Sequence, residues 1–153
     1  MQVVALASSK EAGIFVPDET INKALSFVKS CQEKSSGGFG YKGPSMPGYA
    51  RTAAGVTSLM LGGQRDDPAI EEGLKWLRKN VDKEDHYMYG RYYATIAMLQ
   101  SGEEDYHTFY GPVHDKLISK QDRNGGWGGQ DCVTQMSILI LGTPYRFIPI
   151  YQK

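Results

Sequence analysis

The sequence predicts an all-α protein in which inner and outer helices alternate along a single domain of residues 1–153. Two observations lead to this prediction. Three apolar segments end in glycine at a fixed period, because 102 − 62 and 142 − 102 both give 40 residues. A glycine-rich turn also occurs twice, each time between a helix-like segment and an apolar one. Such a fixed period is the sequence signature of a repeat protein.

The glycines Gly62, Gly102 and Gly142 define a register in which equivalent positions carry similar side chains. The residues three places before them are Leu59, Leu99 and Leu139, and those six places before them are Val56, Ile96 and Met136. Glycine commonly follows a helix because it adopts the left-handed conformation without a Cβ clash. We therefore expect a helix to end at each of these glycines, in that conformation.

Outer helices are predicted where apolar residues recur at helical spacing opposite a charged face. Their apolar positions are Ile21, Ala24, Leu25 and Val28, then Ile70, Gly73, Leu74 and Leu77, and more loosely Tyr110, Val113 and Leu117. Inner helices are apolar or small on nearly all sides, as in 53–61 and 133–141, which predicts burial on most sides. The expected order is inner 2–12, outer 18–33, inner 50–61, outer 67–80, inner 91–101, outer 106–121 and inner 131–141.

Two aspartates are predicted to cap outer helices. Asp67 precedes Pro68, a favourable pair of N-cap and first helical residue. Asp18 follows Pro17 and is expected to cap the helix that begins there. The tail 143–153 is apolar enough that we expect it to pack on another surface.

The order of helices begins with an inner helix that has no outer partner before it. A repeat unit needs a neighbour to bury its apolar face. The sequence therefore suggests either a C-terminal piece of a longer array or a domain that closes its open edge by self-association, as a homo-oligomer.

Charge and hydropathy exclude several classes of partner. The 17 basic and 17 acidic residues cancel, and no basic block occurs, which argues against nucleic-acid binding. The apolar run 138–141 is too short to span a bilayer. The N-terminus lacks the basic region of a signal peptide, and Cys31 and Cys132 fit no disulfide framework, which favours free thiols in a reducing compartment such as the cytoplasm.

The two turns resemble the Gln–Trp repeat of the terpenoid cyclase and protein prenyltransferase superfamily, which includes squalene cyclases. The better copy is 121–128, QDRNGGWG, and the degenerate copy is 32–40, QEKSSGGFG. The segments 86–94 and 141–152 are similar to those of uncharacterised bacterial members. This resemblance implies an α/α-toroid, here a partial ring, in which the glutamine and the aromatic residue join neighbouring repeats. The implied structural residues are Gln32, Gly38, Phe39, Gln121, Gly126 and Trp127.

The same register points to candidate ligand-binding residues. Eleven residues before each glycine stand Arg51, Arg91 and Asp131, and Tyr49 and Tyr89 precede the two arginines by two places. In a toroid these helix N-termini meet at one mouth of the cavity. Arginine there opposes the helix dipole, so it needs a carboxylate or an anionic partner. The alternatives are an Arg–Asp network that closes the mouth and a site for a substrate or partner.

A tyrosine-rich segment adds Tyr87, Tyr89, Tyr92 and Tyr93 as candidates, because their π faces would suit a cationic or flat apolar ligand. Helical spacing cannot place all four on one face. Some of them are therefore expected to pack between repeats.

Catalytic groups typical of the family are missing from the sequence. The Asp-x-Asp-Asp acid motif of squalene-type cyclases and the Cys-Gly-Glu-Gln thioester segment do not occur. Asp131 and Cys132 are adjacent, whereas the zinc-binding Asp and Cys of prenyltransferases are separated by one residue, so no metal or other cofactor is predicted. Asp131 stays a candidate acid, with helix capping as the alternative.

Three functions follow as hypotheses. The first is a non-catalytic domain that binds an apolar, isoprenoid-like ligand or a partner helix on its inner surface. The second is a cyclase or prenyl-transfer enzyme that uses Asp131 and a tyrosine-lined cavity. The third is a structural module that associates with itself.

Overall fold

The computed structural model describes residues 2–81, 87–128, 131–147 and 152, and it describes only the backbone of residues 87 and 131. Seven α-helices and one 3₁₀-helix occur in these ranges. They are α1 (Gln2–Glu11), α2 (Asp18–Ser30), α3 (Tyr49–Leu61), α4 (Pro68–Lys79), α5 (Tyr87–Ser101), α6 (Glu103–Ser119), α7 (Asp131–Leu141) and η1 (Thr143–Tyr145). Apart from one isolated bridge between Gln32 and Phe39, these ranges contain no β-structure. The predicted all-α class is confirmed.

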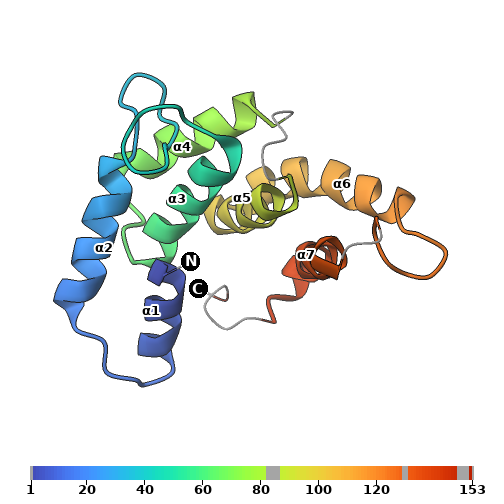
Figure 1. The fold of residues 1–153 in the computed structure, drawn as a ribbon, viewed down its shortest axis with the longest axis horizontal. Helices are drawn as coiled ribbons and strands as arrows, with labels where there is room; N and C mark the ends of the chain where they lie inside the picture. The colour runs from blue at the N-terminus through green and yellow to red at the C-terminus, as the bar shows by residue number, and fades with distance from the viewer. Residues whose placement is uncertain (1, 82–86, 129–130, 148–151, 153) are drawn as a thin grey trace.

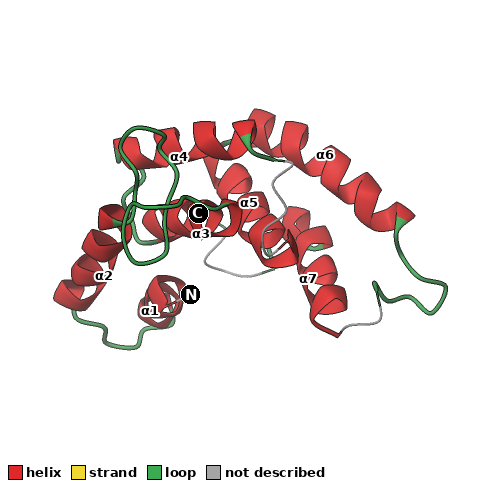
Figure 2. Cartoon of the chain, turned by 45° about the horizontal axis from the view of Figure 1, so that its top comes forward, coloured by secondary structure: helices red, strands yellow, loops and turns green. Residues whose placement is uncertain are grey.

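The helices form an arc in which α2, α4 and α6 lie at the periphery and α1, α3, α5 and α7 lie toward the middle (Figure 1). Figure 2 shows α4 and α6 along one side, with α3, α5 and α7 beneath them. The most extensive packing joins α3 to α5, and α4 and α6 pack on α3 and α5 respectively. Contacts from α5 to α7 and from α3 to α1 extend the middle row to both ends.

All seven predicted helices occur in the expected order, but α5 and α6 begin four and three residues earlier than expected. The aromatic start of α5 lacks the apolar pattern that the prediction used. The first turn of α6 consists of polar residues, Glu103, Glu104 and Asp105, so it also lacks that apolar pattern. Carboxylates there stabilise the helix through its dipole.

Middle-row helices with neighbours on both sides are buried nearly all round, whereas an outer helix buries only one face. Ten of the 13 residues of α3 are buried, as is every residue of α5 from 91 to 98. Helix α4 instead buries one face through Ile70, Leu74 and Leu77 and exposes Glu71 and Lys75 on the other. Hydrophobic burial of this one face is what fixes an outer helix to the middle row.

The expectation that α7 is buried on most sides is wrong. Ile138 is 58% exposed and Leu139 is 40% exposed. Helix α7 is the last of the middle row, so α5 and α6 cover one side of it and no further α-helix of the described chain covers the other. The face that α3 buries is therefore open to solvent on α7.

The three register glycines follow their helices as expected, but none of them has the expected left-handed helical conformation. Gly62 and Gly142 have φ of −79° and −81°, so the left-handed expectation is wrong for both. Gly102 has a φ of 142°, which favours glycine without being left-handed helical. A Cβ at Gly62 would lie 2.5 Å from Cδ2 of Leu25, so close packing of α2 requires glycine there.

One predicted cap is confirmed and one is wrong. The Asp67 carboxylate accepts a hydrogen bond from the backbone N–H of Ala69 at 3.0 Å, as an N-cap should. Asp18 is instead the first residue of α2, whose N-cap Pro17 makes no side-chain capping bond. Its carboxylate pairs with Lys10 at 2.5 Å, which joins α2 to α1.

The tail packs on the helices only at its start. Thr143 is buried, and its hydroxyl lies 3.0 Å from the Tyr106 hydroxyl. Tyr145 and Phe147 stack on each other but are 70% and 77% exposed, so the expected packing of the tail is wrong for these two residues. Within the described ranges, every helix is too short or too polar to cross a membrane.

Candidate functional site

The two glycine-rich turns share a hydrogen bond from the glutamine side chain to the first glycine of the pair. Gln32 Nε2 donates to the carbonyl of Gly37 at 3.0 Å, and Gln121 Nε2 donates to the carbonyl of Gly125 at 2.9 Å. Gly37 and Gly125 have φ of +81° and +85°. A residue with a Cβ is strained at such angles, which explains why both turns have glycine there.

The backbone of the two turns also matches. In each turn the residue after the glutamine donates its N–H to the carbonyl of the second glycine at 2.8 Å, from Glu33 to Gly38 and from Asp122 to Gly126. The chain therefore closes the same loop twice, although the first copy has one more residue in its polar spacer.

The aromatic residue of each turn is fixed to the helix that follows. The N–H of Phe39 donates to Oγ1 of Thr52 at 2.9 Å, and the N–H of Trp127 donates to Oγ1 of Thr134 at 3.0 Å. Thr52 lies in α3 and Thr134 lies in α7, so each turn is attached to the start of its own middle-row helix.

The first turn also joins two repeats. Gln32 Nε2 donates a second hydrogen bond, at 2.9 Å, to the carbonyl of Ala69 in the first turn of α4. The Phe39 ring, 1% exposed, lies where a Cβ at Gly55 of α3 would be 2.7 Å from it and a Cβ at Gly73 of α4 would be 3.3 Å from it. Glycine on both helices lets the ring fit between them.

Trp127 in the second turn is also buried, at 6% exposed, and its indole N–H donates to the carbonyl of Leu117 in α6 at 2.8 Å. This contact attaches the turn to the preceding outer helix. Gln121 is exposed, in contrast to the half-buried Gln32. The second turn therefore holds its aromatic residue as the first turn does. In the described chain, however, no outer helix follows α7, so Gln121 has no equivalent of the bond from Gln32 to α4.

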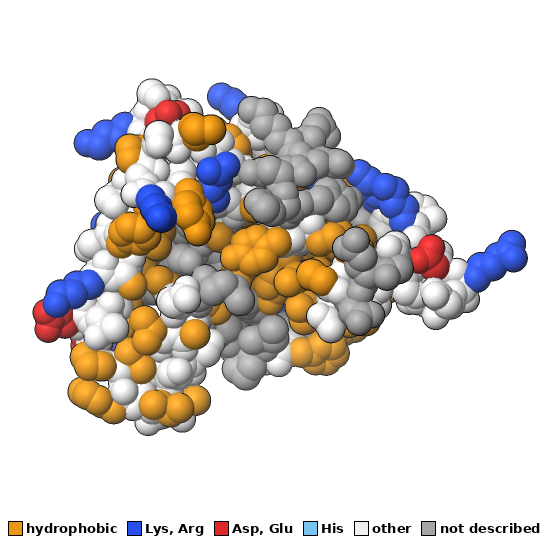
Figure 3. Space-filling view, viewed as in Figure 1, with side chains coloured by type: hydrophobic (Ala, Val, Ile, Leu, Met, Phe, Trp, Pro, Cys, Tyr) orange, Lys and Arg blue, Asp and Glu red, His pale blue; other side chains and the backbone are white. Residues whose placement is uncertain are grey.

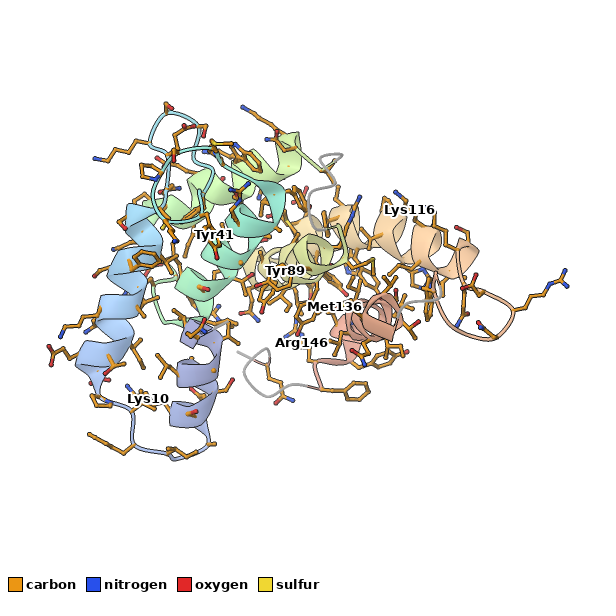
Figure 4. The ribbon with its side chains drawn as sticks, viewed as in Figure 1. Lys10, Tyr41, Tyr89, Lys116, Met136 and Arg146 are labelled. Atoms are coloured by element: carbon orange, nitrogen blue, oxygen red, sulfur yellow. The ribbon has the colours of Figure 1, made fainter. Side chains whose placement is uncertain are left out.

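A pocket of about 850 Å³ lies between the C-terminal half of α2 and the N-terminal half of α3, with the first turn and the start of α5 at its edges. Its lining residues are Phe27, Val28, Cys31, Phe39, Gly40, Tyr41, Ala50, Arg51, Ala54, Gly55, Ser58 and Tyr89. Figure 4 labels Tyr41 and Tyr89, both on the face toward the viewer. In the same view, hydrophobic side chains gather over the middle of the molecule and charged ones lie mainly at its rim (Figure 3).

Two of the predicted ligand-binding residues line this pocket. Arg51 comes from the first turn of α3, and Tyr89 from the first turn of α5. The third predicted residue of this group, Tyr49, is instead 2% exposed. A Cβ at Gly90 would lie 3.1 Å from its ring, so Tyr49 packs α3 closely on α5 rather than facing the pocket.

Arg91 does not share the pocket of Arg51, so the expectation of one common mouth is wrong for this pair. Arg91 is 8% exposed, and its Nη2 donates to the carbonyl of Val81 at 3.4 Å. It lines a separate pocket between α4, α5 and α6. Tyr89 and Arg91 are two residues apart on a helix, which turns their side chains to nearly opposite sides.

The tyrosine cluster contributes one residue to the pocket and two to the core. Tyr92 and Tyr93 are 8% and 3% exposed, and their ring centroids lie 5.2 Å apart. The Tyr93 ring also lies 4.8 Å from that of Tyr89. Burial, followed by the neighbouring Tyr89, raises the pKa of Tyr93 far above its usual value, so its phenol stays neutral. The side chain of Tyr87 lies outside the described residues.

Cys31 is a buried free thiol in the pocket wall, and Cys132 is an exposed free thiol on α7. Burial is the main cause that raises the pKa of Cys31, which favours the neutral thiol. The pocket therefore presents Cys31 as a small apolar group rather than as a nucleophile.

Asp131, the candidate acid, is the first residue of α7, but its side chain lies outside the described residues. Among the side chains that the structure describes, no three His, Cys, Asp or Glu residues are grouped so that they could hold a metal.

Sequence reasoning missed Phe27 and Tyr41, two aromatic residues at the pocket. Phe27 is 55% exposed and Tyr41 is 73% exposed. Phe27 lies off the buried stripe of α2, and Tyr41 directly follows the glycine turn. Neither residue belongs to a repeated pattern, so no signal in the sequence could have found them.

Comparison with models of known families, with curated proteins and with solved structures found no match to this chain.

Proposed function

We propose that this chain is a partial α/α-toroid that binds an apolar, isoprenoid-like ligand in the pocket between α2 and α3, without catalysing its conversion. The observation that supports this proposal best is the pocket itself. It measures about 850 Å³ and is lined chiefly by apolar and aromatic side chains, with Arg51 at its wall. Small-molecule sites are usually concave and mostly apolar, with a few polar groups that orient the ligand, and have volumes of roughly 300–1,000 Å³.

The rigid frame around the pocket supports the same proposal. Phe39 forms part of the pocket wall and is also the residue held between Gly55 and Gly73. The hydrogen bond from its N–H to Thr52 fixes the turn on α3. Because Phe39 is already held between two repeats, it loses little conformational entropy when a ligand binds against it.

The toroid arrangement is part of the proposal. Alternation of peripheral and middle helices, two matching turns and a register of 40 residues all suit such an array. The partial ring would present the ends of α3 and α5 on its inner side, where Arg51 and Tyr89 lie.

Binding of farnesol, a neutral isoprenoid alcohol, tests the proposal. Quenching of intrinsic fluorescence should give a saturable curve with the wild-type chain. Ala54 is half-buried in the pocket wall, so Ala54→Phe should fill the space and weaken binding by at least about tenfold.

Ala5→Phe is the matched control, because Ala5 is an exposed residue of α1 outside the pocket. It should bind farnesol as the wild type does. Equal binding by the wild type and Ala54→Phe would place the ligand elsewhere and reject the pocket.

Self-association is a second candidate, favoured by the open apolar face of α7. Ile138 and Leu139 are exposed there, whereas Leu59, which is equivalent to Leu139 in α3, is completely buried. Sedimentation should then show a dimer or larger species that Leu139→Glu dissociates. A monomer at high concentration would remove this candidate. The catalytic alternative depends on Asp131 and stays a prediction.

A further inference from the structure

The loop that joins α1 to α2 is apolar and exposed. It comprises residues 12–17, AGIFVP, and none of its side chains is charged or polar. Phe15 is 88% exposed, the largest fraction for any bulky hydrophobic side chain in the described chain, and Ile14 is 61% exposed. Figure 1 shows this loop at the lower edge of the molecule, and Figure 3 shows hydrophobic side chains gathered at the same corner.

The end of α1 does not explain why Ile14 is apolar. The N–H of Gly13 donates to the carbonyl of Lys10 at 3.1 Å, and the N–H of Ile14 donates to the carbonyl of Ser9 at 3.0 Å. With a φ of +80° at Gly13, this is a Schellman motif. In that motif the residue at the place of Ile14 usually contacts an apolar residue at the place of Ser9. Serine offers Ile14 no such contact.

The start of α2 explains Val16 but not Phe15. Val16 precedes the N-cap Pro17, the position of a hydrophobic staple, and it packs against the core. Phe15 belongs neither to the core nor to the partly buried residues packed on it. A Cβ at Gly13 would meet nothing within 4 Å, so this side of the loop projects into open space. Ile14 and Phe15 therefore do not serve to pack the described chain.

The backbone of the loop suits apolar surroundings. A backbone N–H without a partner is costly away from water. The N–H groups of Ala12, Gly13 and Ile14 all donate to carbonyls of α1, and Pro17 has no N–H. At most two of the six residues, 15 and 16, therefore have an N–H left for water or a lipid headgroup.

The small size of the loop favours lipid over a protein partner. Burial of an aromatic side chain covers about 150–250 Å². Each partner in a stable protein interface covers about 800 Å². Exposed charged residues flank the loop on both sides, Lys10 and Glu11 before it and Asp18 and Glu19 after it, so the apolar surface ends there. A bilayer needs neither a minimum contact area nor a complementary shape.

The charges beside the loop indicate which kind of lipid surface it suits. Lys10 pairs with Asp18 at 2.5 Å, and Lys23 pairs with Glu19 at 2.6 Å. Two lysines thus stand beside two carboxylates, with no positive excess in these pairs. Attraction to anionic headgroups comes from such an excess of lysine or arginine. The loop is therefore suited to a zwitterionic surface.

We propose that loop 12–17 docks the chain on the surface of a zwitterionic lipid bilayer, with Ile14 and Phe15 inserted at the boundary between headgroups and acyl chains. The loop has no residue in common with the lining of the apolar pocket, so this docking is independent of the ligand proposed there. Only two large side chains enter the lipid. Binding is therefore weak and reversible, as it is for a single short anchor.

Flotation of the whole chain with phosphatidylcholine vesicles tests this proposal. The wild type should float with the vesicles to an extent that rises with lipid concentration. Phe15→Ser should lower the partition coefficient by at least about tenfold, and Ile14→Ser by about threefold to tenfold. Both side chains are exposed, so the variants should keep the fold. Addition of phosphatidylserine or salt should not change the partition coefficient by more than about twofold.

Phe147→Ser is the matched control, because Phe147 is also an aromatic residue, 77% exposed, and lies outside the loop. It should float as the wild type does. Absence of flotation, or flotation only with anionic vesicles, would overturn the proposal. Equal losses for Phe15→Ser and Phe147→Ser would also overturn it, since they would indicate general adhesion of exposed apolar groups. So would a dimer that Phe15→Ser dissociates in the absence of vesicle binding, because the loop would then contact a second copy.

Discussion

At the scale of single residues, the two turns form an internal comparison. Gln32 makes two hydrogen bonds, one within its turn and one to Ala69 of the next helix. Gln121 makes the first of these bonds, to Gly125, and is exposed. The chain therefore has one copy of this glutamine with both hydrogen bonds and one copy with only the bond inside the turn. Comparison of the two separates the stability that comes from the turn from the stability that comes from the bond between repeats.

Replacement of each glutamine by alanine measures that difference. Gln32→Ala should lower the free energy of unfolding by about 1–3 kcal/mol, because it leaves the carbonyl of the buried Ala69 without this partner. Gln121→Ala should cost only about 0.5–1 kcal/mol. Denaturant unfolding gives both values. Equal costs would show that the bond to α4 contributes nothing to joining the repeats.

Glycine at position 55 is predicted to be required by the Phe39 ring. Gly55→Ala puts a Cβ 2.7 Å from Cδ1 of Phe39, so the ring or the helix must move, at a cost of about 1–3 kcal/mol. Gly43→Ala is the matched control, because a Cβ there meets nothing within 4 Å. It should change stability by less than about 0.5 kcal/mol. Thermal unfolding of both variants checks this, and a stable Gly55→Ala would contradict the packing described for the joint.

At the scale of helices, position in the array decides what an equivalent residue contributes. Leu59 in α3 and Leu139 in α7 occupy the same place in the register, yet their exposed fractions are 0% and 40%. The sequence predicts equal burial for both, because periodicity describes the helix and not its neighbours. Helix α3 has packed helices on both sides, whereas α7 has them on one.

Alanine at these two positions should therefore have unequal effects. Leu59→Ala leaves a cavity in the core and should cost about 2–5 kcal/mol. Leu139→Ala removes a half-exposed side chain and should cost about 1 kcal/mol or less. Chemical denaturation of the two variants measures the difference. A large cost for Leu139→Ala in the monomeric chain would show that α7 is covered.

Ion pairs between outer helices predict how stability depends on pH. The Lys29 ammonium and the N–H of Ala69 hold the pKa of Asp67 below its ordinary value, with burial acting the other way. Burial tends to raise the pKa of Asp105, but hydrogen bonds from Arg78 and Ser101 outweigh it and lower that pKa. Carboxyls whose folded pKa is lowered stabilise the fold fully above the unfolded pKa of about 4.

Stability should therefore fall as the pH drops through 4 and below, where these carboxylates take up protons in the unfolded chain before the folded one. Asp67→Asn with Asp105→Asn should reduce stability at neutral pH and flatten this acid-induced fall. Urea unfolding between neutral pH and pH 3 checks both effects. The same slope in wild type and double variant would show that other groups control acid unfolding.

At the scale of the whole molecule, helices were predictable from sequence and surfaces were not. The glycine period, the amphipathic stripes of α2 and α4 and the cap at Asp67 are local signals, and they located all seven helices. Burial of α7 and of the tail depends on neighbours that periodicity does not contain. That is why Ile138 was expected to be buried and Phe147 to pack on another surface, whereas both are exposed in the structure.

The candidate site was predictable in part for the same reason. The register singled out Arg51 and Tyr89, which line the pocket, and Tyr49, which packs in the core. It treated Arg51 and Arg91 as equivalent, although helix rotation and neighbouring helices place them at different pockets. Phe27 and Tyr41 belong to no repeated pattern, so only the tertiary structure brings them to the site.

The claim that the pocket between α2 and α3 binds an apolar ligand is tested most directly by mapping farnesol on the isotope-labelled chain by NMR. Saturable amide shifts should cluster at Gly40, Ala54, Gly55 and Tyr89 and leave the N-terminal helix α1 unchanged. Shifts centred on the exposed face of α7, or none that saturate, would contradict it.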